Sequence, residues 1–360
     1  MKILVTGASG FIGNFLLAAL RDAGHEVRAA SRSRVEQQEI DYVLAPELGH
    51  DADWSRALNA VDAVIHLAGR AHVPTKNADA ETEELYFRIN TEGTRALAEQ
   101  AAAAGAKHFV FLSSCHALAA ESGEILNAET SPHPLSAYGH SKLEAERAIR
   151  KALSNTACAW TILRPPLVYG KGNKANFGLL LKLVKSGIPL PLASVRNRRS
   201  FIYVENLVDV IVACLGNAKA FGKTYLPSDG EDVSTPELIR KIAKANQSFQ
   251  FSEFSGPVSD KNTRHSSLAT RHSARLFPFP ENALKAMGRL PGLGALRKLT
   301  SSLYVDSEPL REDLDWSPRF TMEEGLVKTP QRVMSRRKKF NQEIIIQQTL
   351  DVYREIIIAE

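Results

Sequence analysis

The first thirteen residues, Met1–Gly13, decide the fold: MKILVTGASGFIG. Residues 2–5 form a short, mostly apolar run typical of a buried strand, and residues 11–20 repeat their apolar side chains at helical spacing. The turn between them carries three glycines, Gly7, Gly10 and Gly13. Bare backbone there can approach a ligand, and the N–H groups at the positive end of the helix dipole suit a pyrophosphate. The alternative is a tight turn that needs glycine only for its dihedral angles, and a glycine triplet alone does not decide between the two.

The composition is that of a globular protein. With 360 residues, 44% of them hydrophobic, the chain can bury a large core and is expected to form one large domain or two unequal ones. No apolar run approaches the about 18 residues of a membrane span, and the N-terminus enters the first strand without room for a signal peptide. We therefore expect a cytoplasmic protein without a transmembrane segment.

The cysteines and the charges argue against several kinds of site. Cys115, Cys158 and Cys214 lie far apart without metal-ligand spacing, which predicts reduced thiols and no metal site. The net charge is +5, and residues 250–300 hold eight Lys and Arg against three acids, while residues 336–339 form a short basic run. We interpret both as solvated surface and expect no nucleic-acid partner, because no aromatic interleaving or nucleic-acid motif accompanies them.

Further along the chain, apolar strand patterns alternate with helical ones. Strands are expected at 26–31, 61–68, 108–114 and 160–164, and helices at 86–104 and 141–153. This alternation predicts an α/β fold, a doubly wound parallel sheet of Rossmann-like type, whose ligand crevice lies beyond the carboxyl ends of the strands. Polar residues at those ends are therefore candidates for a site.

The pattern changes after residue 166 into loops, helices and short strands at 201–204 and 223–226. We therefore expect three parts: a dinucleotide-binding domain at 1–165, a smaller C-terminal substrate lobe at 166–328, some of whose segments return to the sheet, and an extension of unknown role at 329–360.

Two segments stand outside this pattern. Residues 247–273 are rich in Ser, Arg and His and follow a helical pattern at 237–245, so we expect a long surface loop. Residues 343–358 could form a helix with apolar faces. That helix would dock on its own domain or, in the alternative, make a subunit contact in a homodimer.

A candidate reaction centre lies in Tyr138-Gly-His-Ser-Lys142, where Lys142 follows Tyr138 by about one helical turn, so both side chains can share one face. The helix follows the strand that ends in Ser113-Ser114, so a hydroxyl, a phenol and an ammonium can converge at the mouth of the crevice. The alternative is an ordinary surface contact between neighbouring side chains.

The chemistry of these three groups suits hydride transfer at a carbinol carbon, which requires a proton to move at its oxygen. Tyr138 would be the acid/base. Because a phenol with a pKa of about 10 is a poor base at neutral pH, the Lys142 ammonium and a cationic nicotinamide would have to favour phenolate. Lys142 could also hold the nicotinamide ribose, and Ser114 would hydrogen-bond the substrate oxygen.

Several motifs together resemble the extended short-chain dehydrogenase/reductases that act on nucleotide sugars, the NAD-dependent epimerase/dehydratase family. The resemblance covers residues 1–245, with further matches at 314–320 and 323–326. The motifs are Thr6-Gly-Ala-Ser-Gly-Phe-Ile-Gly13, His66-Leu-Ala-Gly69, Asn90 in Ile-Asn-Thr-Glu-Gly-Thr94, Ser113-Ser114, Tyr138-x-x-x-Lys142 and Leu163-Arg-Pro-Pro-Leu-Val-Tyr-Gly170.

The resemblance implies a UDP-sugar substrate, an NADP(H) or NAD(H) cofactor and a set of binding residues. The cofactor would be held by Gly7, Gly10, Phe11, Ile12, Gly13, Ser31, Arg32, Leu67, Ala68, Tyr138, Lys142 and Pro165, and the substrate by Ser114, Asn176, Phe177 and Arg199. A guanidinium fork at Arg199 suits a diphosphate, and its alternative is a surface salt bridge. The family role of Asn90 is mainly to order backbone near the active site.

The end of the strand at 26–31 bears on the choice of cofactor. An acid near this position would normally hold a free ribose 2′-hydroxyl, whereas Ser31-Arg32-Ser33-Arg34 offers hydroxyl and guanidinium groups suited to a 2′-phosphate. We therefore predict that NADP(H) is accepted at least as well as NAD(H). The alternative is that these arginines merely cap a strand at the surface.

Within the family, segments 173–177 and 189–203 look most like the bacterial subgroup that reduces UDP-4-keto-6-deoxy-N-acetylhexosamine to UDP-N-acetylquinovosamine for surface polysaccharide synthesis. We therefore expect a sugar-nucleotide reductase. The alternative is a UDP-hexose or UDP-N-acetylhexosamine 4-epimerase with bound NAD. Cys115 and His116 replace the Asp-Glu pair of the family's dehydratases, which argues against a 4,6-dehydratase. A non-catalytic nucleotide-binding protein is a more distant alternative, since it has no need of the complete hydroxyl, phenol and ammonium set.

Overall fold

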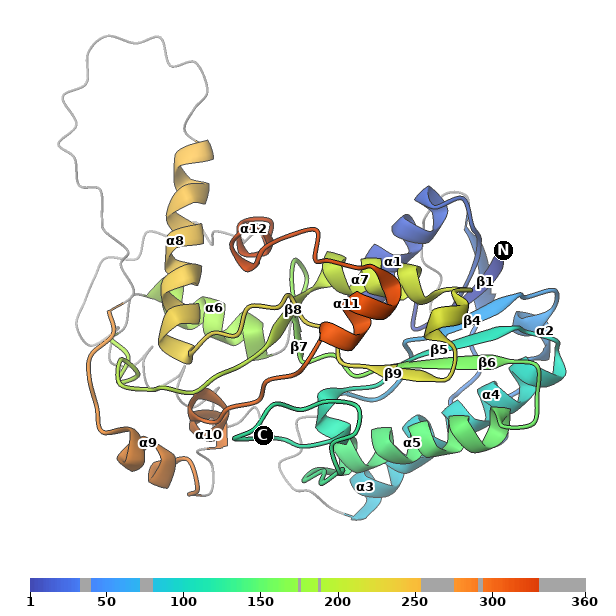
Figure 1. Ribbon diagram of the computed structural model, residues 1–360, viewed down its shortest axis with the longest axis horizontal. Coiled ribbons are helices and arrows are strands. Elements are labelled where there is room, and N and C mark those ends of the chain that lie inside the picture. Colours follow the sequence, from blue (N-terminus) through green and yellow to red (C-terminus); the bar gives the residue numbers. More distant parts are fainter. Residues whose placement is uncertain are drawn as a thin grey trace, which may run out of the picture. The chain divides into compact units, whose positions relative to one another are not determined.

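The computed structural model describes residues 1–32, 40–71, 80–173, 176–186, 189–253, 275–290 and 294–329. The chain divides into two compact units (Figure 1). Unit 1 comprises Met1–Tyr169, Ser200–Asp232 and Ser302–Phe320, and unit 2 comprises Gly170–Arg199, Val233–Ser301 and Thr321–Glu360. The assignment of a cofactor domain and a substrate lobe to particular ranges stays a prediction.

Unit 1 is built on a seven-stranded parallel sheet with the order β3-β2-β1-β4-β5-β6-β9. The order runs outward in opposite directions from β1 and β4, which makes their carboxyl ends the topological switch point where ligands of such sheets bind. The doubly wound, Rossmann-like fold is therefore confirmed. The strands are β1 (Lys2–Thr6), β2 (Glu26–Ser31), β3 (Asp41–Leu44), β4 (Ala63–His66), β5 (His108–Leu112), β6 (Ala159–Leu163) and β9 (Lys223–Tyr225).

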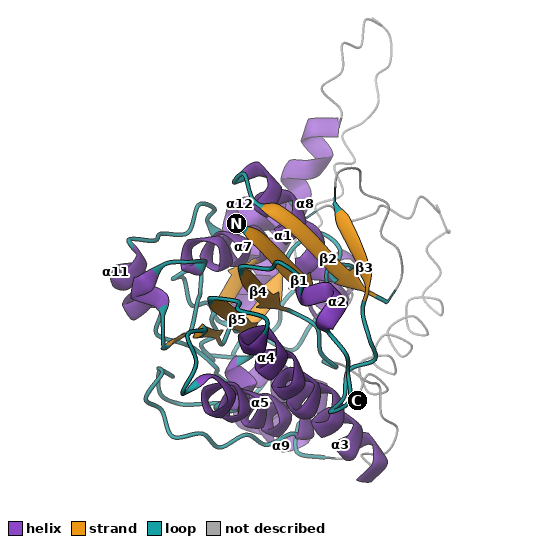
Figure 2. Cartoon of the chain, turned by 90° about the vertical axis from the view of Figure 1, so that its right-hand side faces the viewer, coloured by secondary structure: helices purple, strands orange, loops and turns teal. Residues whose placement is uncertain are grey.

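Helices cover both faces of this sheet because alternate strand residues point to opposite sides (Figure 2). Ile3 and Val5 of β1 are buried in a cluster with one set of helices, and Leu4 between them is buried in a cluster with the other set. The first set is α1 (Phe11–Asp22), α7 (Val204–Cys214) and α11 (Glu308–Leu314), and the second is α2 (Ser55–Leu58), α4 (Gly93–Ala103) and α5 (Ala137–Leu153).

Smaller elements complete unit 1. A π-helical segment at Phe87–Glu92 joins α3 (Ala80–Tyr86) to α4, and π-turns of this kind occur frequently at functional sites. Two short 3₁₀ turns lie at Cys115–Ala117 and Ala218–Ala220, and β7 (Leu167–Tyr169) pairs with β8 (Phe201–Tyr203) in a second, two-stranded parallel sheet.

Unit 2 is helical. Its elements are α6 (Asn176–Ser186), α8 (Thr235–Glu253), α9 (Glu281–Met287), α10 (Gly294–Thr300) and α12 (Met322–Val327). The buried Asn197 locks it together, because its amide donates to the Thr235 hydroxyl and to the Leu299 and Ser301 carbonyls and accepts from the Thr235 N–H. Lys241 and Lys244 of α8 form ion pairs with Glu323 of α12.

The structure corrects the sequence analysis at three places in the described chain. The expected loop at 247–273 is helical at its start, because α8 runs to Glu253 without a glycine or proline to end it. The helix expected at 86–104 begins at Ala80, and the one expected at 141–153 begins at Ala137. The rest of the expected loop, Arg34 and the expected helix at 343–358 lie outside the described residues.

The described residues include neither a membrane-spanning helix nor a metal-binding cluster. None of their helices is long and apolar enough to cross a bilayer. None of their His, Cys, Asp and Glu side chains gather in a group that could hold a metal ion.

Candidate functional site

The glycine turn between β1 and α1 is packed against the end of β4 by direct backbone contact. Gly7 has a φ of +70°, and a Cβ added there would lie 2.7 Å from the Ala68 nitrogen and 2.9 Å from the Leu67 carbonyl carbon. At Gly13 a Cβ would lie 2.5 Å from the Gly7 oxygen. Only glycine permits these approaches, so the turn needs glycine for packing as well as for its dihedral angles.

The N-terminus of α1 follows this turn with its N–H groups uncapped by side chains. Gly10 is the N-cap residue, in extended conformation, and no side-chain hydrogen bond caps it within the part of the chain that the structure describes. Phe11 and Ile12 form the first turn of the helix. Unsatisfied N–H groups at the positive end of a twelve-residue helix fit the pyrophosphate of a dinucleotide.

His66, at the carboxyl end of β4, connects this turn to the rest of the sheet. Its Nδ1 lies 2.6 Å from the Thr6 hydroxyl and its Nε2 lies 2.9 Å from the Thr94 hydroxyl, and the Thr6 oxygen also accepts from the Ala68 N–H at 3.4 Å. Burial, reinforced by the positive charge of Lys142, lowers the pKa of His66 to about 3. His66 is therefore a neutral, positioning side chain, a role that its place in a motif did not reveal.

Ser114, Tyr138 and Lys142 are assembled at the carboxyl end of β5. Ser114 begins the 3₁₀ turn after β5, where its oxygen accepts from the His116 N–H at 3.2 Å, and its side chain is hydrogen-bonded to Tyr138. Tyr138 lies in the first turn of α5, and Lys142 follows one turn later. The Lys142 Nζ donates to the Leu112 carbonyl at 2.9 Å and lies 4.6 Å from the centre of the Phe111 ring. The predicted juxtaposition of the three residues is thus present in the structure.

The local sequence explains why α5 presents Tyr138 there. Ser136 caps the helix by accepting from the Gly139 N–H at 3.1 Å, which places Tyr138 just inside the first turn. At Gly139 the α5 backbone passes close to the His116 carbonyl, where a Cβ would clash. The cap and the close approach together hold Tyr138 beside the segment that carries Ser114.

The environment shifts both titratable groups of the set. Burial raises the pKa of Tyr138 to about 12, and its hydrogen bond with Ser114 opposes the shift. Burial lowers the pKa of the Lys142 ammonium to about 8, and the nearby Glu146 carboxylate opposes that shift. In the protein alone, Tyr138 is therefore protonated at neutral pH and is an acid. Acting as a base requires additional positive charge beside it.

Asn90 of the π-helical segment ties the chain after β4 to α5. Its amide nitrogen donates to the Arg70 carbonyl and to the Ser141 hydroxyl, both at 2.9 Å, and its oxygen accepts from the Arg70 N–H at 2.7 Å. Ser141 in turn donates to the Tyr138 carbonyl at 2.9 Å. These contacts agree with the backbone-ordering role that the family resemblance implied for Asn90.

A buried ion pair that the sequence analysis missed supports the same region. Glu146 of α5 and Arg164, which follows β6, are 0% and 3% exposed and form two hydrogen bonds of 2.9 and 2.6 Å. The Ser113 hydroxyl donates to Glu146 at 2.5 Å, and the Pro165 carbonyl accepts from the Cys115 N–H at 3.0 Å. Glu146 follows Lys142 by four residues, and that spacing was the signal that could have pointed to it.

The remaining candidate residues lie at four other places. Ser31 is buried at the end of β2, and Arg32 beside it is exposed. In unit 2, Asn176 begins α6. Phe177 is 2% exposed, so its ring belongs to the core of unit 2. One terminal nitrogen of Arg199 donates to the Lys298 carbonyl at 2.7 Å, at the end of α10.

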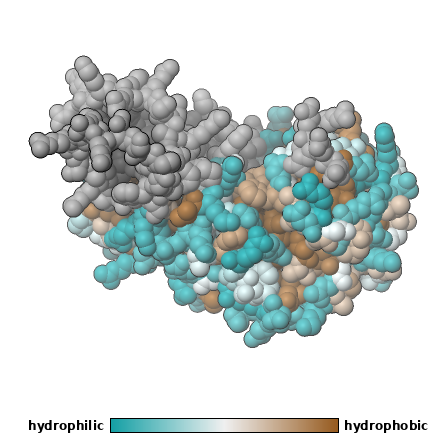
Figure 3. Space-filling view, turned by 90° about the horizontal axis from the view of Figure 1, so that it is seen from above, coloured by the Kyte–Doolittle hydropathy of each residue, from teal (hydrophilic) through white to brown (hydrophobic). Residues whose placement is uncertain are grey.

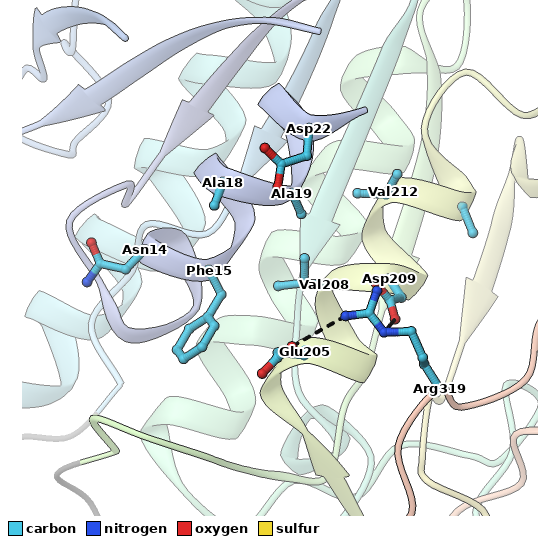
Figure 4. Close-up of a pocket in the computed structure, with 11 residues that line it drawn as sticks. Asn14, Phe15, Ala18, Ala19, Asp22, Glu205, Val208, Asp209, Val212 and Arg319 are labelled. Carbon is cyan, nitrogen blue, oxygen red and sulfur yellow. Dashed lines mark hydrogen bonds and ion pairs between the residues drawn. The ribbon is translucent and has the colours of Figure 1, made fainter. Parts of the chain in front are cut away.

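A cavity of about 520 Å³ lies between α1 and α7 (Figure 4). Arg319 crosses it to Glu205 and Asp209, at 3.4 and 3.7 Å. Apolar side chains of both helices, including Phe15, form much of its lining, and Figure 3 shows apolar areas interrupting the hydrophilic surface on the face seen from above. None of the candidate residues lines this cavity, so it is separate from the candidate site.

Comparison with known proteins places this fold and these residues in a family. The model of the NAD dependent epimerase/dehydratase family matches residues 3–226. The chain belongs to this family. Its resemblance to the extended short-chain dehydrogenase/reductases is therefore confirmed, and with it the prediction of an enzyme that uses a nicotinamide dinucleotide.

Individual relatives support the membership. A UDP-glucose 4-epimerase of Vibrio cholerae is 35% identical over 335 residues, covering 92% of this chain and 94% of the relative. An N-acetyl-alpha-D-glucosaminyl-diphospho-ditrans,octacis-undecaprenol 4-epimerase of Escherichia coli O157:H7 is 28% identical over 68% of this chain and 72% of its own length. A solved UDP-N-acetylglucosamine 4-epimerase from Bacillus cereus has a TM-score of 0.67 at 20% identity, covering 91% of this chain and 94% of that one, and so shares the fold.

Proposed function

We propose that the protein oxidises and reduces C4 of the sugar in a UDP-sugar, and that a 4-epimerase is the activity best supported. The observation that carries the proposal is the hydrogen-bonded pair Ser114–Tyr138 with Lys142 one turn on, at the carboxyl end of β5, the strand next to β4 at the switch point of the sheet. The similarity to a UDP-glucose 4-epimerase over nearly the whole chain supports the choice of reaction. It leads us to place epimerisation ahead of the one-way reduction that the sequence alone favoured.

The protein groups divide the proton chemistry between them. Ser114 donates a hydrogen bond to the sugar O4 and holds it beside the phenol. Tyr138 gives a proton to that oxygen when C4 is reduced and takes it back when C4 is oxidised. The Lys142 ammonium favours the phenolate that oxidation requires, since a positive charge nearby lowers the pKa of a phenol.

The cofactor would be held by the parts of unit 1 that fit it. The α1 N-terminus would bind the pyrophosphate through the N–H groups of Phe11 and Ile12, Ser31 and Arg32 would face the adenosine ribose, and Lys142 would hold the nicotinamide ribose. When bound, the nicotinamide supplies the hydride acceptor or donor. Leu67, Ala68 and Pro165 would line its path by their backbone and apolar surface. This leaves the phenol and hydroxyl pair to face the sugar.

Residues of unit 2 would hold the uridine diphosphate. Asn176 and Phe177 open α6, and because Phe177 is 2% exposed it would support the binding site from within the core of unit 2. Arg199, whose guanidinium donates to the Lys298 and Ser301 carbonyls, would contact the diphosphate through the same charged group. The cytoplasmic location, the homodimer and a role in surface polysaccharide synthesis stay predictions.

A second candidate is the 4-ketoreductase expected from the sequence. It is favoured by the end of β2, where Ser31 and the exposed Arg32 take the place of an acid and suit the 2′-phosphate of NADP(H). A reductase must exchange its cofactor at every turnover, whereas an epimerase keeps NAD while the keto sugar turns within the site.

The test is to incubate the purified protein with UDP-glucose or UDP-N-acetylglucosamine without added nicotinamide and to resolve the products by NMR. An epimerase converts each substrate that it accepts to a mixture with its 4-epimer. If no epimer forms, and a UDP-4-keto sugar with added NADPH is reduced mole for mole, the reductase takes its place. The Tyr138→Phe variant is the control, because neither reaction should survive in it.

A further inference from the structure

We propose that Arg70 binds the sugar half of the nucleotide-sugar substrate and selects sugars that present acceptor oxygens to it. The proposal rests on the proposed function, since it names a specificity determinant for the same site. The roles proposed above leave this side chain unassigned.

The backbone of Arg70 is fixed in both directions. The Asn90 side chain accepts from its N–H at 2.7 Å and donates to its carbonyl at 2.9 Å. The buried Asn90 side chain thus binds the peptide groups on both sides of Arg70 and fixes its Cα. A fixed Cα reduces the conformational freedom that the side chain loses on binding a ligand, which favours a specific contact.

The guanidinium extends toward the reaction centre. Its central carbon lies 5.8 Å from the centre of the Tyr86 ring, within the range of a cation–π contact. The Tyr86 ring in turn packs edge-on against the Tyr138 ring, with 6.2 Å between their centres. A positive charge therefore lies one aromatic ring away from the residue proposed as acid/base.

A polar atom of this side chain is left without a partner. The Arg70 Nε is buried and has no hydrogen-bond partner among the described residues. A buried, unpaired donor costs about 1–3 kcal/mol, and more when it is charged, so such atoms in native proteins call for an explanation. An acceptor supplied by a bound ligand explains this one.

The path of the chain after β4 indicates which ligand supplies this acceptor. Leu67 and Ala68 contact the Gly7 turn, where the dinucleotide backbone would lie. Gly69 comes next, and a Cβ placed on it would lie 3.4 Å from the Lys142 Nζ. Arg70 follows directly in the sequence. Because Lys142 lies beside Gly69, and the Tyr138 ring lies against the Tyr86 ring that Arg70 contacts, we infer that the acceptor belongs to the group that reacts with the nicotinamide, which in the proposed function is the sugar.

The chemistry of a guanidinium defines what it selects. It donates in a planar fork, which hydroxyl oxygens satisfy, an acyl carbonyl satisfies better and a carboxylate satisfies best because it is charged. Sugars that carry an N-acetyl or carboxylate substituent should therefore gain more from Arg70 than an unsubstituted hexose does.

The test compares Arg70→Met and Arg70→Lys with the wild type. Methionine keeps apolar packing on Tyr86 without donors, and lysine keeps the charge without the fork. Arg88→Met is the control, because Arg88 lies exposed in the neighbouring π-helical segment, where it forms a 3.7 Å ion pair with the exposed Glu47. Calorimetry would measure the binding of NAD, UDP, UDP-glucose, UDP-N-acetylglucosamine and UDP-glucuronic acid to each protein, and melting temperatures would verify folding.

We expect Arg70→Met to weaken at least one of the UDP-sugars about tenfold or more, with the substituted sugars losing most, while NAD and UDP bind as before. Arg70→Lys should recover part of the loss, and Arg88→Met should match the wild type. An equal loss for UDP, or unchanged UDP-sugar binding in both Arg70 variants, overturns the proposal. If the wild type binds UDP but no UDP-sugar, it is the proposed function itself that fails.

Discussion

At the carboxyl end of β4, His66 lies between the Thr6 and Thr94 hydroxyls, and at the amino end of β5, His108 lies between the Thr161 hydroxyl and the Gly216 N–H. Both imidazoles are buried and both have a lowered pKa, about 3 for His66 and about 4 for His108. Their chemistry is nearly the same, yet only His66 is connected through hydrogen bonds to the glycine turn.

The two hydrogen-bond networks differ in the backbone segment that each one positions. At the amino end, the Thr161 hydroxyl passes the His108 contact on to the Ala220 carbonyl, and the network closes within the core. At the carboxyl end, the His66 network leads to the Ala68 N–H, beside a turn with uncapped N–H groups. Similar residues thus build a stabilising network at one end and a positioning network at the other.

Among the substitutions that distinguish the carboxyl end of the sheet from the amino end, Tyr138→Phe is expected to have the largest effect on turnover. Loss of the phenol should lower turnover about 100- to 10,000-fold, because the proton-transfer group is gone while the ring packing survives. Steady-state rates and cofactor binding would be measured together, and the binding of cofactor should change little.

The matched control is Tyr42→Phe in the edge strand β3. The Tyr42 hydroxyl is buried without a hydrogen-bond partner in the described chain, so its removal should leave turnover unaltered and should not lower stability. A Tyr138→Phe enzyme that retains activity within about threefold of the wild type would rule out Tyr138 as the acid/base.

Alanine substitutions at Gly7 and at Gly24 should differ in their effect on cofactor binding. Both glycines have positive φ, +70° and +78°, so each substitution should cost about 1–2 kcal/mol in backbone strain. A Cβ at Gly24, between α1 and β2, meets nothing within 4 Å, whereas at Gly7 it meets the Ala68 backbone. We therefore expect about a tenfold or greater loss of cofactor affinity in Gly7→Ala alone, measured by fluorescence titration. Equal affinity in the two variants would contradict the placement of the dinucleotide.

Glutamine at His66 and at His108 tests the two networks directly. Each substitution should lower the free energy of unfolding by about 1–3 kcal/mol, since each disturbs buried hydrogen bonds. Only His66→Gln should also weaken cofactor binding, because only that network reaches the backbone of residues 67–68. Denaturant unfolding and cofactor titration on the same samples would show whether the two effects separate.

Low pH should destabilise the folded protein through both histidines, His66 and His108. The folded-state pKa of each histidine lies below the ordinary value of 6.5, so the unfolded chain takes up protons first as the pH falls. The stability contributed by the neutral imidazoles is therefore complete above pH 6.5 and is lost progressively toward pH 4 and 3. Melting temperatures measured from pH 8 to pH 4 should fall less steeply in either glutamine variant than in the wild type.

The smallest effect is expected at the exposed Arg32. Removal of a guanidinium beside the ribose should reduce the preference for NADP(H) over NAD(H) by a few-fold to about tenfold, because exposed charge contacts are weak. Arg32→Ala would be compared with the wild type by titration with both cofactors. An unchanged preference, or a tenfold preference for NADH in the wild type, would show that these residues do not read a 2′-phosphate.

Much of unit 1 could be predicted because its signals are local. The glycine turn, the alternation of strands and helices, and the spacing of Tyr138 and Lys142 all lie within short windows of sequence. The edge strand β3 was not predicted, because its four residues are half-exposed or exposed and show no buried pattern. The end of α8 was misjudged because its composition is polar, although nothing in it stops a helix.

The parts of the candidate site that escaped prediction depend on contacts between distant segments. Glu146 and Arg164 pair across 18 residues, and His66 reaches Thr6 across 60. A sequence shows that such groups exist but not that the fold buries them together. The unpartnered Nε of Arg70 likewise becomes informative only once its surroundings are known.

In the proposed function, the carboxyl end of this sheet carries out hydride transfer on a nucleotide sugar through Tyr138. The most direct test is a single-turnover experiment in which cofactor-loaded protein is mixed with excess UDP-sugar and the near-ultraviolet absorbance of reduced nicotinamide is followed. We predict a transient rise in the wild type and none in Tyr138→Phe, with both proteins binding the sugar. A rise of equal size and rate in the two proteins, or no change of absorbance in the wild type with any UDP-sugar that it binds, would contradict the claim.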